Sequence, residues 1–278
     1  MTRSTFIAAG LALAAVLPAI PAQATQAASL TRTFVSSAGN DSNPCTVTQP
    51  CATFAQAYSL TAAQGIIAAL DPGKYGPLSI TGPITINGNG WAAITAPAAG
   101  NGITINVNSG DKVALIGLNI DGAGTGYNGI AFNSFGSLTV TDCVLQNFFW
   151  NGSGLNTGNG ILIQPTAGPV NFTVTNTTAS NNGLAGISYT PLSGVPSANG
   201  IIDHVVATAN LHGIVISPTS TTGGSTVVAI SNSIASNNSG IGISGSNNAL
   251  TRAETHKIHQ TMVATRQTEA RKFLANLS

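Results

Sequence analysis

Charged residues are scarce in this chain of 278 residues, because they make up 6% of it, and aromatic residues make up only 5%. Between Thr33 and Thr251 there is no arginine and no glutamate. Lys74 and Lys112 are the only cations there, and two cations against six aspartates leave a net charge of −4. Such a body has no basic track for a polyanion, so we expect no nucleic-acid partner.

Long apolar runs are also missing. The longest, Phe6–Ala19, is shorter than the roughly 20 residues that a bilayer-spanning helix needs, so we expect no membrane span. Its setting is typical of an export signal, because Arg3 precedes it and Ala22-Gln23-Ala24 follows it as a small-residue cleavage site, with Ala28 as a second one. We assign residues 1–24 to a signal peptide and expect a secreted, periplasmic or cell-surface protein.

Cysteine occurs three times. Cys45 and Cys51 lie six residues apart, between two prolines. In an oxidising compartment this pair favours a loop disulfide, and the alternative is two free thiols. Cys143 falls where the apolar pattern points inward, so we interpret it as a small buried hydrophobic residue.

What the chain does contain is a repeat. Six strand-like segments each open with a glycine, at spacings of 27, 31, 26, 27 and 27 residues: Gly102, Gly129, Gly160, Gly186, Gly213 and Gly240. A second series of apolar landmarks has a similar period: Leu115, Val140, Val174, Ile202 and Ile230. Apolar residues alternate within each period, as in strands, and such units bury their apolar faces only when they stack. The sequence predicts an all-β parallel β-solenoid of about seven rungs.

Two polar columns accompany the repeat. The first lies two residues after the second landmark: Gly117, Asp142, Asn176, His204 and Asn232. The second lies five residues further on: Gly122, Asn147, Asn181, Ala209 and Asn237. Asparagine, aspartate and glycine tolerate the left-handed backbone, so both columns predict tight corners. Stacked amides in such columns can form a hydrogen-bonded ladder.

The two ends of the body differ from the repeat. Thr53-Phe54-Ala55-Gln56 has the form of a capping box that opens a short helix to about Ala63, and a first strand is expected at Gly65–Leu70. We assign residues 29–76 to an N-terminal capping segment and 77–249 to the β-helix domain. Residues 250–278 lack glycine and proline and hold both glutamates, which indicates a helical or disordered tail. A capping helix, a loose tail and a foreign sequence replacing lost rungs all fit this composition.

The rungs V-T-N-T-T-A-S-N-N-G and I-S-N-S-I-A-S-N-N-S-G-I, together with the opening segment R-T-F-V-S-S-A-G-N-D-S-N-P-C, carry a resemblance to a known family. From about Thr33 to Asn248 the chain resembles the right-handed parallel β-helix proteins of the pectin-lyase-like superfamily. The resemblance implies a right-handed, single-stranded coil, in which an enzyme's cleft lies along an outer strand face. It does not imply one activity, because that superfamily includes lyases, hydrolases, epimerases and proteins without known catalysis.

The outward positions of the glycine-led strands carry no acid, base or metal ligand. Two residues further along each strand lies a neutral stripe: Asn106, Asn133, Gln164, Thr190, Ser217 and Ser244. Its hydroxyl and amide groups suit sugar hydroxyls, but they suit water equally well. Polysaccharide is therefore a candidate partner, and plain solvation is the alternative.

Catalytic residues of the expected kinds are scarce. A pectate-type lyase needs a basic group and calcium-binding acids, and a hydrolase needs carboxylates on either side of the scissile bond. The best constellation is Asp203, His204 and His212, which could support acid–base chemistry or a metal. Alternatively, His204 only fills a corner position and the other two are solvated.

Asp111, Lys112 and Asp121 form a weaker candidate site. We interpret the chain as an exported, non-catalytic surface or envelope protein that contacts polysaccharide. The alternative is a polysaccharide lyase or glycoside hydrolase that acts on uronate-containing polysaccharide. Neither a cofactor nor a metal is expected.

Overall fold

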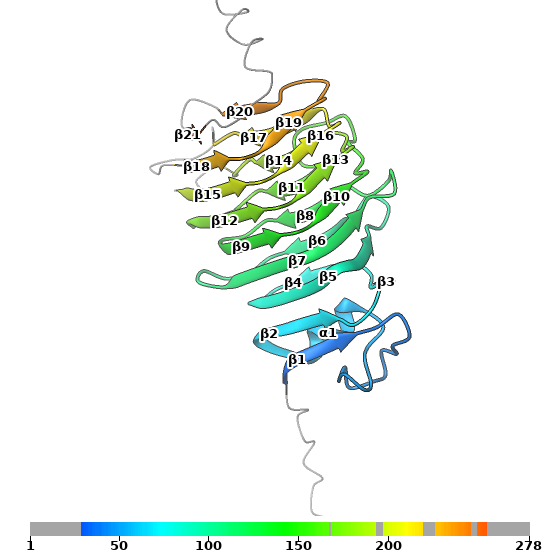
Figure 1. The fold of residues 1–278 in the computed structure, drawn as a ribbon. Coiled ribbons are helices and arrows are strands. Elements are labelled where there is room, and N and C mark those ends of the chain that lie inside the picture. Colours follow the sequence, from blue (N-terminus) through cyan, green and yellow to red (C-terminus); the bar gives the residue numbers. More distant parts are fainter. Residues whose placement is uncertain (1–28, 167, 193–196, 219–225, 246–248, 255–278) are drawn as a thin grey trace, which may run out of the picture.

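The computed structural model describes residues 29–166, 168–192, 197–218, 226–245 and 249–254, and these residues form a parallel β-solenoid (Figure 1). The expected signal peptide, residues 1–24, lies outside the described residues. Within the described ranges, no helix is long and apolar enough to cross a membrane.

One face of the solenoid is a sheet of seven strands, which hold the glycine-led segments. We call it the glycine sheet. Its strands are β4 (Leu78–Ile80), β6 (Asn101–Ile105), β8 (Asn128–Phe132), β11 (Asn159–Ile163), β14 (Ala185–Tyr189), β17 (His212–Ile216) and β20 (Ile243–Gly245). Every pairing between neighbours in this sheet is parallel.

The other strands form a second sheet, which bends at a corner. Before the corner lie the long strands β9 (Gly136–Thr141), β12 (Val170–Thr175), β15 (Ala198–Asp203), β18 (Thr226–Ser231) and β21 (Ala249–Glu254). After it lie the short strands β10 (Val144–Gln146), β13 (Thr178–Ser180), β16 (Val206–Thr208) and β19 (Ile234–Ser236). The first rungs are built from β1 (Leu30–Val35), β2 (Thr61–Ala69), β3 (Gly73–Lys74), β5 (Ile84–Thr95) and β7 (Lys112–Asp121).

Alternation of buried and exposed side chains explains these strands. In β12, Val170, Phe172 and Val174 are buried, whereas the residues between them face outward. In five strands of the glycine sheet, β6, β8, β11, β14 and β17, the second residue is a glycine, and this glycine has a steric reason. A Cβ atom on Gly160 would lie 2.7 Å from the carbonyl oxygen of Gly186 in the next rung. The glycine landmarks therefore mark places where two rungs come too close for a side chain.

Both predicted corners are confirmed by the backbone. At the first corner Asp142, Asn176, His204 and Asn232 have φ values of 56°, 47°, 52° and 47°. At the second corner Asn147, Asn181, Ala209 and Asn237 have φ values of 64°, 56°, 56° and 54°. After β7 the left-handed residue is Ala123 (φ 50°) and not Gly122. Non-glycine residues rarely adopt this conformation, so its repetition in register shows that the corners are part of the repeat.

A ladder of buried asparagines lies one residue beyond the second corner, where the sequence reading did not place it. Asn182 and Asn210 are 2% and 3% exposed. The Asn182 N–H donates to Asn210 Oδ1 at 2.9 Å, and the Asn210 N–H donates to Asn238 Oδ1 at 3.0 Å. Each side chain thus satisfies a backbone group of the rung before it. Cys143 is also buried, as predicted, at 1% exposure.

Near the N-terminal end lies α1 (Phe54–Leu60), and its N-cap is Thr53. The helix ends earlier than expected, because the chain turns extended at Thr61 and enters β2. The expected disulfide is present and joins Cys45 to Cys51. An unexpected strand, β1, pairs with β2 in parallel and adds to this end of the coil.

At the other end the structure departs from the expected boundary. Residues 249–254 form β21, which pairs with β18 along its whole length, and not the beginning of a helical or disordered tail. Residues 255–278, which hold most of the predicted tail, lie outside the described residues.

Candidate functional site

The structure separates the three residues of the predicted catalytic constellation. Asp203 ends β15 and His204 turns the first corner, and His204 Nδ1 lies 2.7 Å from Asp203 Oδ2. His212 begins β17 in the glycine sheet, beyond the second corner. It lines a hollow of about 100 Å³ that includes neither of the other two. The constellation is therefore one adjacent pair and one distant residue.

The Asp203–His204 pair links the first corner to the next rung. Asp203 Oδ1 accepts hydrogen bonds from Ser231 Oγ at 2.7 Å and from Asn232 Nδ2 at 2.9 Å, both in the next rung. Hydrogen bonds from Ser231, His204 and Asn232 lower the pKa of Asp203 to about 2. These hydrogen bonds keep the Asp203 carboxylate ionised and engage its oxygens. Such a group is better suited to linking two rungs than to transferring a proton.

His212 also has a structural partner. Its Nδ1 accepts the Ile241 N–H at 3.1 Å, and burial lowers the pKa of its imidazole. No cluster of three or more metal-ligating side chains occurs among the described residues. The weaker candidate is divided as well, since Asp111 and Lys112 lie where β7 begins and Asp121 lies where it ends.

The neutral stripe is not one open face. Asn106 is exposed, but Thr190 is 7% exposed and its Oγ1 is buried without a hydrogen-bond partner. The loop at residues 151–157 reaches this surface, where Gln164 Nε2 donates to Asn156 Oδ1 at 2.8 Å. The protein itself therefore covers the stripe at Thr190 and contacts it at Gln164.

Ser244 does not belong to the stripe. β20 pairs Ser244 with Val215, two positions before Ser217, because Ile214 pairs with Ile243. The last rung is longer than the period predicted: a Cβ atom on Gly213 would meet the carbonyl oxygen of Gly242, and not of Gly240, at 2.3 Å. Pairing register decides which residues share a column, and here it overrides the glycine count.

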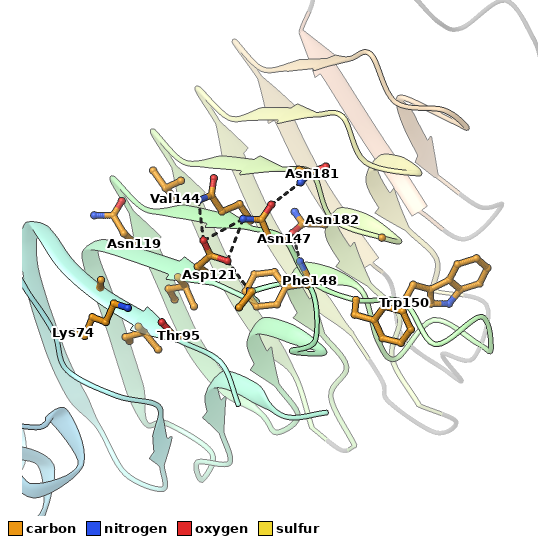
Figure 2. A pocket seen from close by; sticks show the side chains of 18 residues that line it. Lys74, Thr95, Asn119, Asp121, Val144, Asn147, Phe148, Trp150, Asn181 and Asn182 are labelled. Carbon is orange, nitrogen blue, oxygen red and sulfur yellow. Dashed lines mark hydrogen bonds between the residues drawn. The ribbon is translucent and has the colours of Figure 1, made fainter. Parts of the chain in front are cut away.

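A larger hollow lies on another face, along the short strands. It has a volume of about 970 Å³, and we call it the short-strand groove. Figure 2 shows Lys74 at one end, Trp150 at the other and Asp121 between them. The strands β3, β5, β7 and β10 supply its floor, and the turns that follow β7 and β10 supply its wall.

Strand register brings the polar floor of the groove together. Thr95 pairs with Asp121, and Asp121 pairs with Gln146, so the three side chains form a column across β5, β7 and β10. A second column runs through Lys74, Ala93 and Asn119. Lys74 and Asp121 are far apart in the sequence, and this stacking places both of them along the groove.

Asp121 is the one carboxylate among the residues that line the groove. Asn147 Nδ2 donates to both of its oxygens at 3.1 Å, and Gln146 Nε2 donates to Oδ2 at 3.2 Å. Burial alone would raise the pKa of Asp121. Hydrogen bonds from the Ala123 N–H, Asn147 and Gln146 and the charge of Lys74 outweigh burial and hold the pKa below its usual range.

Aromatic side chains stand at the Trp150 end. Phe149 is 48% exposed, and the Trp150 indole N–H donates to the Gly154 carbonyl oxygen at 3.1 Å, which fixes the ring's edge. Trp150 also lines a second hollow of about 490 Å³, which continues along the second corner to Asn237. Aromatic rings beside hydrogen-bonding groups are suited to a ligand with both apolar faces and polar edges.

Of the residues that line this groove, the sequence predicts only Asp121 as a candidate, because the predicted stripe lies on the glycine-led strands of the other sheet. A usable signal was present. The residue before each second-corner position reads Asp121, Gln146, Ser180, Thr208 and Ser236, a polar column on an outer face. The aromatic residues Phe149 and Trp150 follow one of those corners, in the loop that makes the longest interval of the repeat.

Comparison with known proteins adds little to this geometry. No family model matches the chain, and no curated protein matches it. Among solved structures, the chain is similar to pectate lyase Pel9A, at 12% sequence identity and a TM-score of 0.33, with 83% of this chain and 81% of that one covered.

Proposed function

We propose that this protein is an exported, non-catalytic β-helix that binds a polysaccharide in the short-strand groove. The observation that carries the proposal is the combination of a hollow, a floor of hydroxyl, carboxylate and amide groups, and the rings of exposed Phe149 and half-buried Trp150 at one end. Saccharides present hydroxyl edges and apolar ring faces, so both kinds of group find partners there.

The setting of the groove supports binding to an extended chain. The hollow crosses several stacked strands and shares Trp150, Asn182 and Gly183 with the second hollow, an arrangement that suits a linear ligand. The Cys45–Cys51 disulfide is consistent with an oxidising compartment outside the cytoplasm.

A non-catalytic role fits the chemistry of Asp121. A general acid needs a raised pKa, and Asp121 has the reverse. The two-carboxylate arrangement of a glycoside hydrolase has no second member among the residues that line the groove. The alternative activity, cleavage of a uronate-containing polysaccharide, has one observation in its favour: Lys74 and Asp121 line the same hollow.

The test uses the purified chain after removal of residues 1–24. Binding to a panel of soluble polysaccharides is measured by affinity electrophoresis and by calorimetry, and the same mixtures are assayed for reducing ends and unsaturated products. Binding without product formation is the expected result. Turnover that Lys74→Ala or Asp121→Ala abolishes would replace binding with the enzymatic alternative. An absence of binding to every polysaccharide in a broad panel would refute the proposal.

A further inference from the structure

The hydrogen bonds on the floor of the groove run in one direction. A carboxylate can only accept hydrogen bonds, so Gln146 and Asn147 must turn their NH₂ groups toward Asp121. This leaves Asn147 Oδ1 as an acceptor, and Asn181 Nδ2 donates to it at 2.6 Å. Asp121 therefore sets the orientation of amides in the two rungs that follow its own.

The same orientation decides what the groove offers a ligand. The orientation of the Asn119 amide is fixed as well, because Nδ2 donates to the carbonyl oxygen of Gly90 in the preceding rung at 3.0 Å. The amide oxygens of Asn119, Gln146 and Asn181 accept no hydrogen bond within the described part of the chain. None of the three residues is buried, so these oxygens are available. The groove thus presents a row of acceptors around an ionised carboxylate.

A row of acceptors distinguishes between sugars. A hydroxyl group can donate to it, whereas a uronate carboxylate can only accept and carries the same charge as Asp121. Like charges brought together at an interface are strongly unfavourable, and rejection of the wrong ligand is a usual source of specificity. Lys74 lies at one end of the groove and can pair with a single carboxylate, but not with a succession of them along the floor.

We propose that the groove selects neutral, hydroxyl-bearing polysaccharides over uronate-rich ones, and that Asp121 determines this preference by orienting the amides of Gln146 and, through Asn147, of Asn181. The inference rests on the proposed function, because it assumes that a saccharide occupies the groove. It assigns Asp121 as a specificity-determining residue. It also implies that a ligand carboxylate is tolerated only at the end of the floor where Lys74 lies.

The experiment compares pairs of oligosaccharides with the same backbone: galactan with galacturonan, mannan with mannuronan, and glucan with glucuronan. Calorimetry at low ionic strength with a chelator present gives the affinity of each. We expect the neutral member of at least one pair to bind at least about tenfold more tightly than its uronate partner, which corresponds to one charge repulsion of about 1.4 kcal/mol.

Asp121→Asn is the decisive variant, because an amide at this position no longer dictates the orientation of Gln146 and Asn147. We expect it to reduce the preference several-fold, mainly through tighter uronate binding. Asp203→Asn is the matched control, since it removes another carboxylate that accepts an amide hydrogen bond but lies outside the groove. It should keep the wild-type preference.

A second measurement avoids dependence on the variant's folding. Added salt screens charge repulsion, so the wild-type preference should narrow as the ionic strength rises from about 0.01 M to 1 M, while neutral affinities stay constant. Equal or tighter uronate binding that requires Trp150 overturns the inference but leaves the proposed function standing. Failure of every pair to bind refutes the proposed function, and the inference with it.

Discussion

Two asparagine columns stand one residue apart at the second corner, and they differ in what surrounds them. Asn181 is exposed, turns the chain with a φ of 56° and extends its amide toward the groove. Asn182 is 2% exposed, and its side chain accepts from the Phe148 N–H and donates to the Leu145 carbonyl oxygen, both backbone groups inside the coil. Two adjacent asparagines thus have different roles: one faces the groove and the other bonds to the backbone inside the coil. The direction in which the backbone points each residue decides the task, and residue type alone does not.

The largest effect on folding should come from the inner column. Asn210→Ala removes the acceptor of the Asn182 N–H and the donor to the Ala179 carbonyl oxygen, which are bonded at 2.9 and 3.0 Å. Two buried backbone groups then lose their partners, so the free energy of unfolding should fall by about 2 to 5 kcal/mol. Urea denaturation followed by circular dichroism measures the change.

The matched control for this variant is Asn237→Ala in the outer column. Ala209 already occupies that column with a φ of 56°, so the corner accepts alanine. We expect a loss of about 1 kcal/mol or less, which reflects the strain of a left-handed alanine. Losses of equal size at Asn210 and Asn237 would remove the distinction between the two columns.

The groove beside the outer column should depend on its aromatic end. Trp150→Ala removes a ring that lines both hollows, and we expect polysaccharide affinity to fall about tenfold or more, in line with one lost stacking contact of about 1 to 3 kcal/mol. Trp91→Ala is the control, since Trp91 is 43% exposed but does not line either hollow. Calorimetry with the best ligand gives both affinities. An equal loss of affinity for the two variants would show that the ligand does not bind in the groove.

A smaller effect should follow from completing the outer column. Ala209→Asn places an amide between Asn181 and Asn237, at a backbone conformation that asparagine adopts more easily than alanine. We expect a gain of about 0.5 to 1 kcal/mol in the free energy of unfolding. Thermal denaturation of the variant and the parent measures it, and a lower melting temperature would count against the corner assignment.

The smallest effect concerns pH at the first corner. The pKa of Asp203 is lowered in the folded protein from an ordinary value of 3.8 to about 2, so its ionised form stabilises the fold above pH 4. That contribution is lost as the pH falls from about 4 to 2. Asp203→Asn should therefore flatten the acid side of the stability curve over this window.

Urea midpoints measured between pH 7 and about pH 2 test this expectation. Asp142→Asn, in the same corner column, is the comparison, because no hydrogen bond to the Asp142 carboxylate occurs in the described part of the chain. A curve for Asp203→Asn that matches the parent would show that the contacts with Ser231 and Asn232 contribute nothing to stability.

Much of the fold could be predicted because it repeats. The period, the left-handed corners at Asn176 and Asn181, and the inward position of Cys143 all follow from local rules applied once per rung. The stacking glycines followed as well, although their steric cause needs the neighbouring rung. Local propensity and repeat spacing agree in this chain, and this agreement allows the fold to be predicted from the sequence.

The site could not be predicted in the same way. Asp121 and Lys74 come together only through the pairing of β3, β5 and β7, which the sequence does not state. The prediction that Ser244 belongs to the neutral stripe was wrong, because the spacing of the glycines does not show where strand pairing resumes after a longer turn. β1 was missed because it pairs only with β2 and carries no repeat signal. Contacts between distant segments decided each of these cases.

The parallel register has a consequence for how such a molecule can change in size. Each strand in the middle of the coil pairs with its counterpart one rung away, as Val174 pairs with Val140 and Ile202. The number of rungs can therefore change while the cross-section of each rung stays the same. Duplication of one whole rung would leave every existing neighbour relation intact and lengthen the outer faces by one strand spacing, about 4.8 Å. Insertion of a single residue into a strand would instead turn its core side chains outward. The architecture therefore tolerates change in units of a rung and resists change in units of a residue.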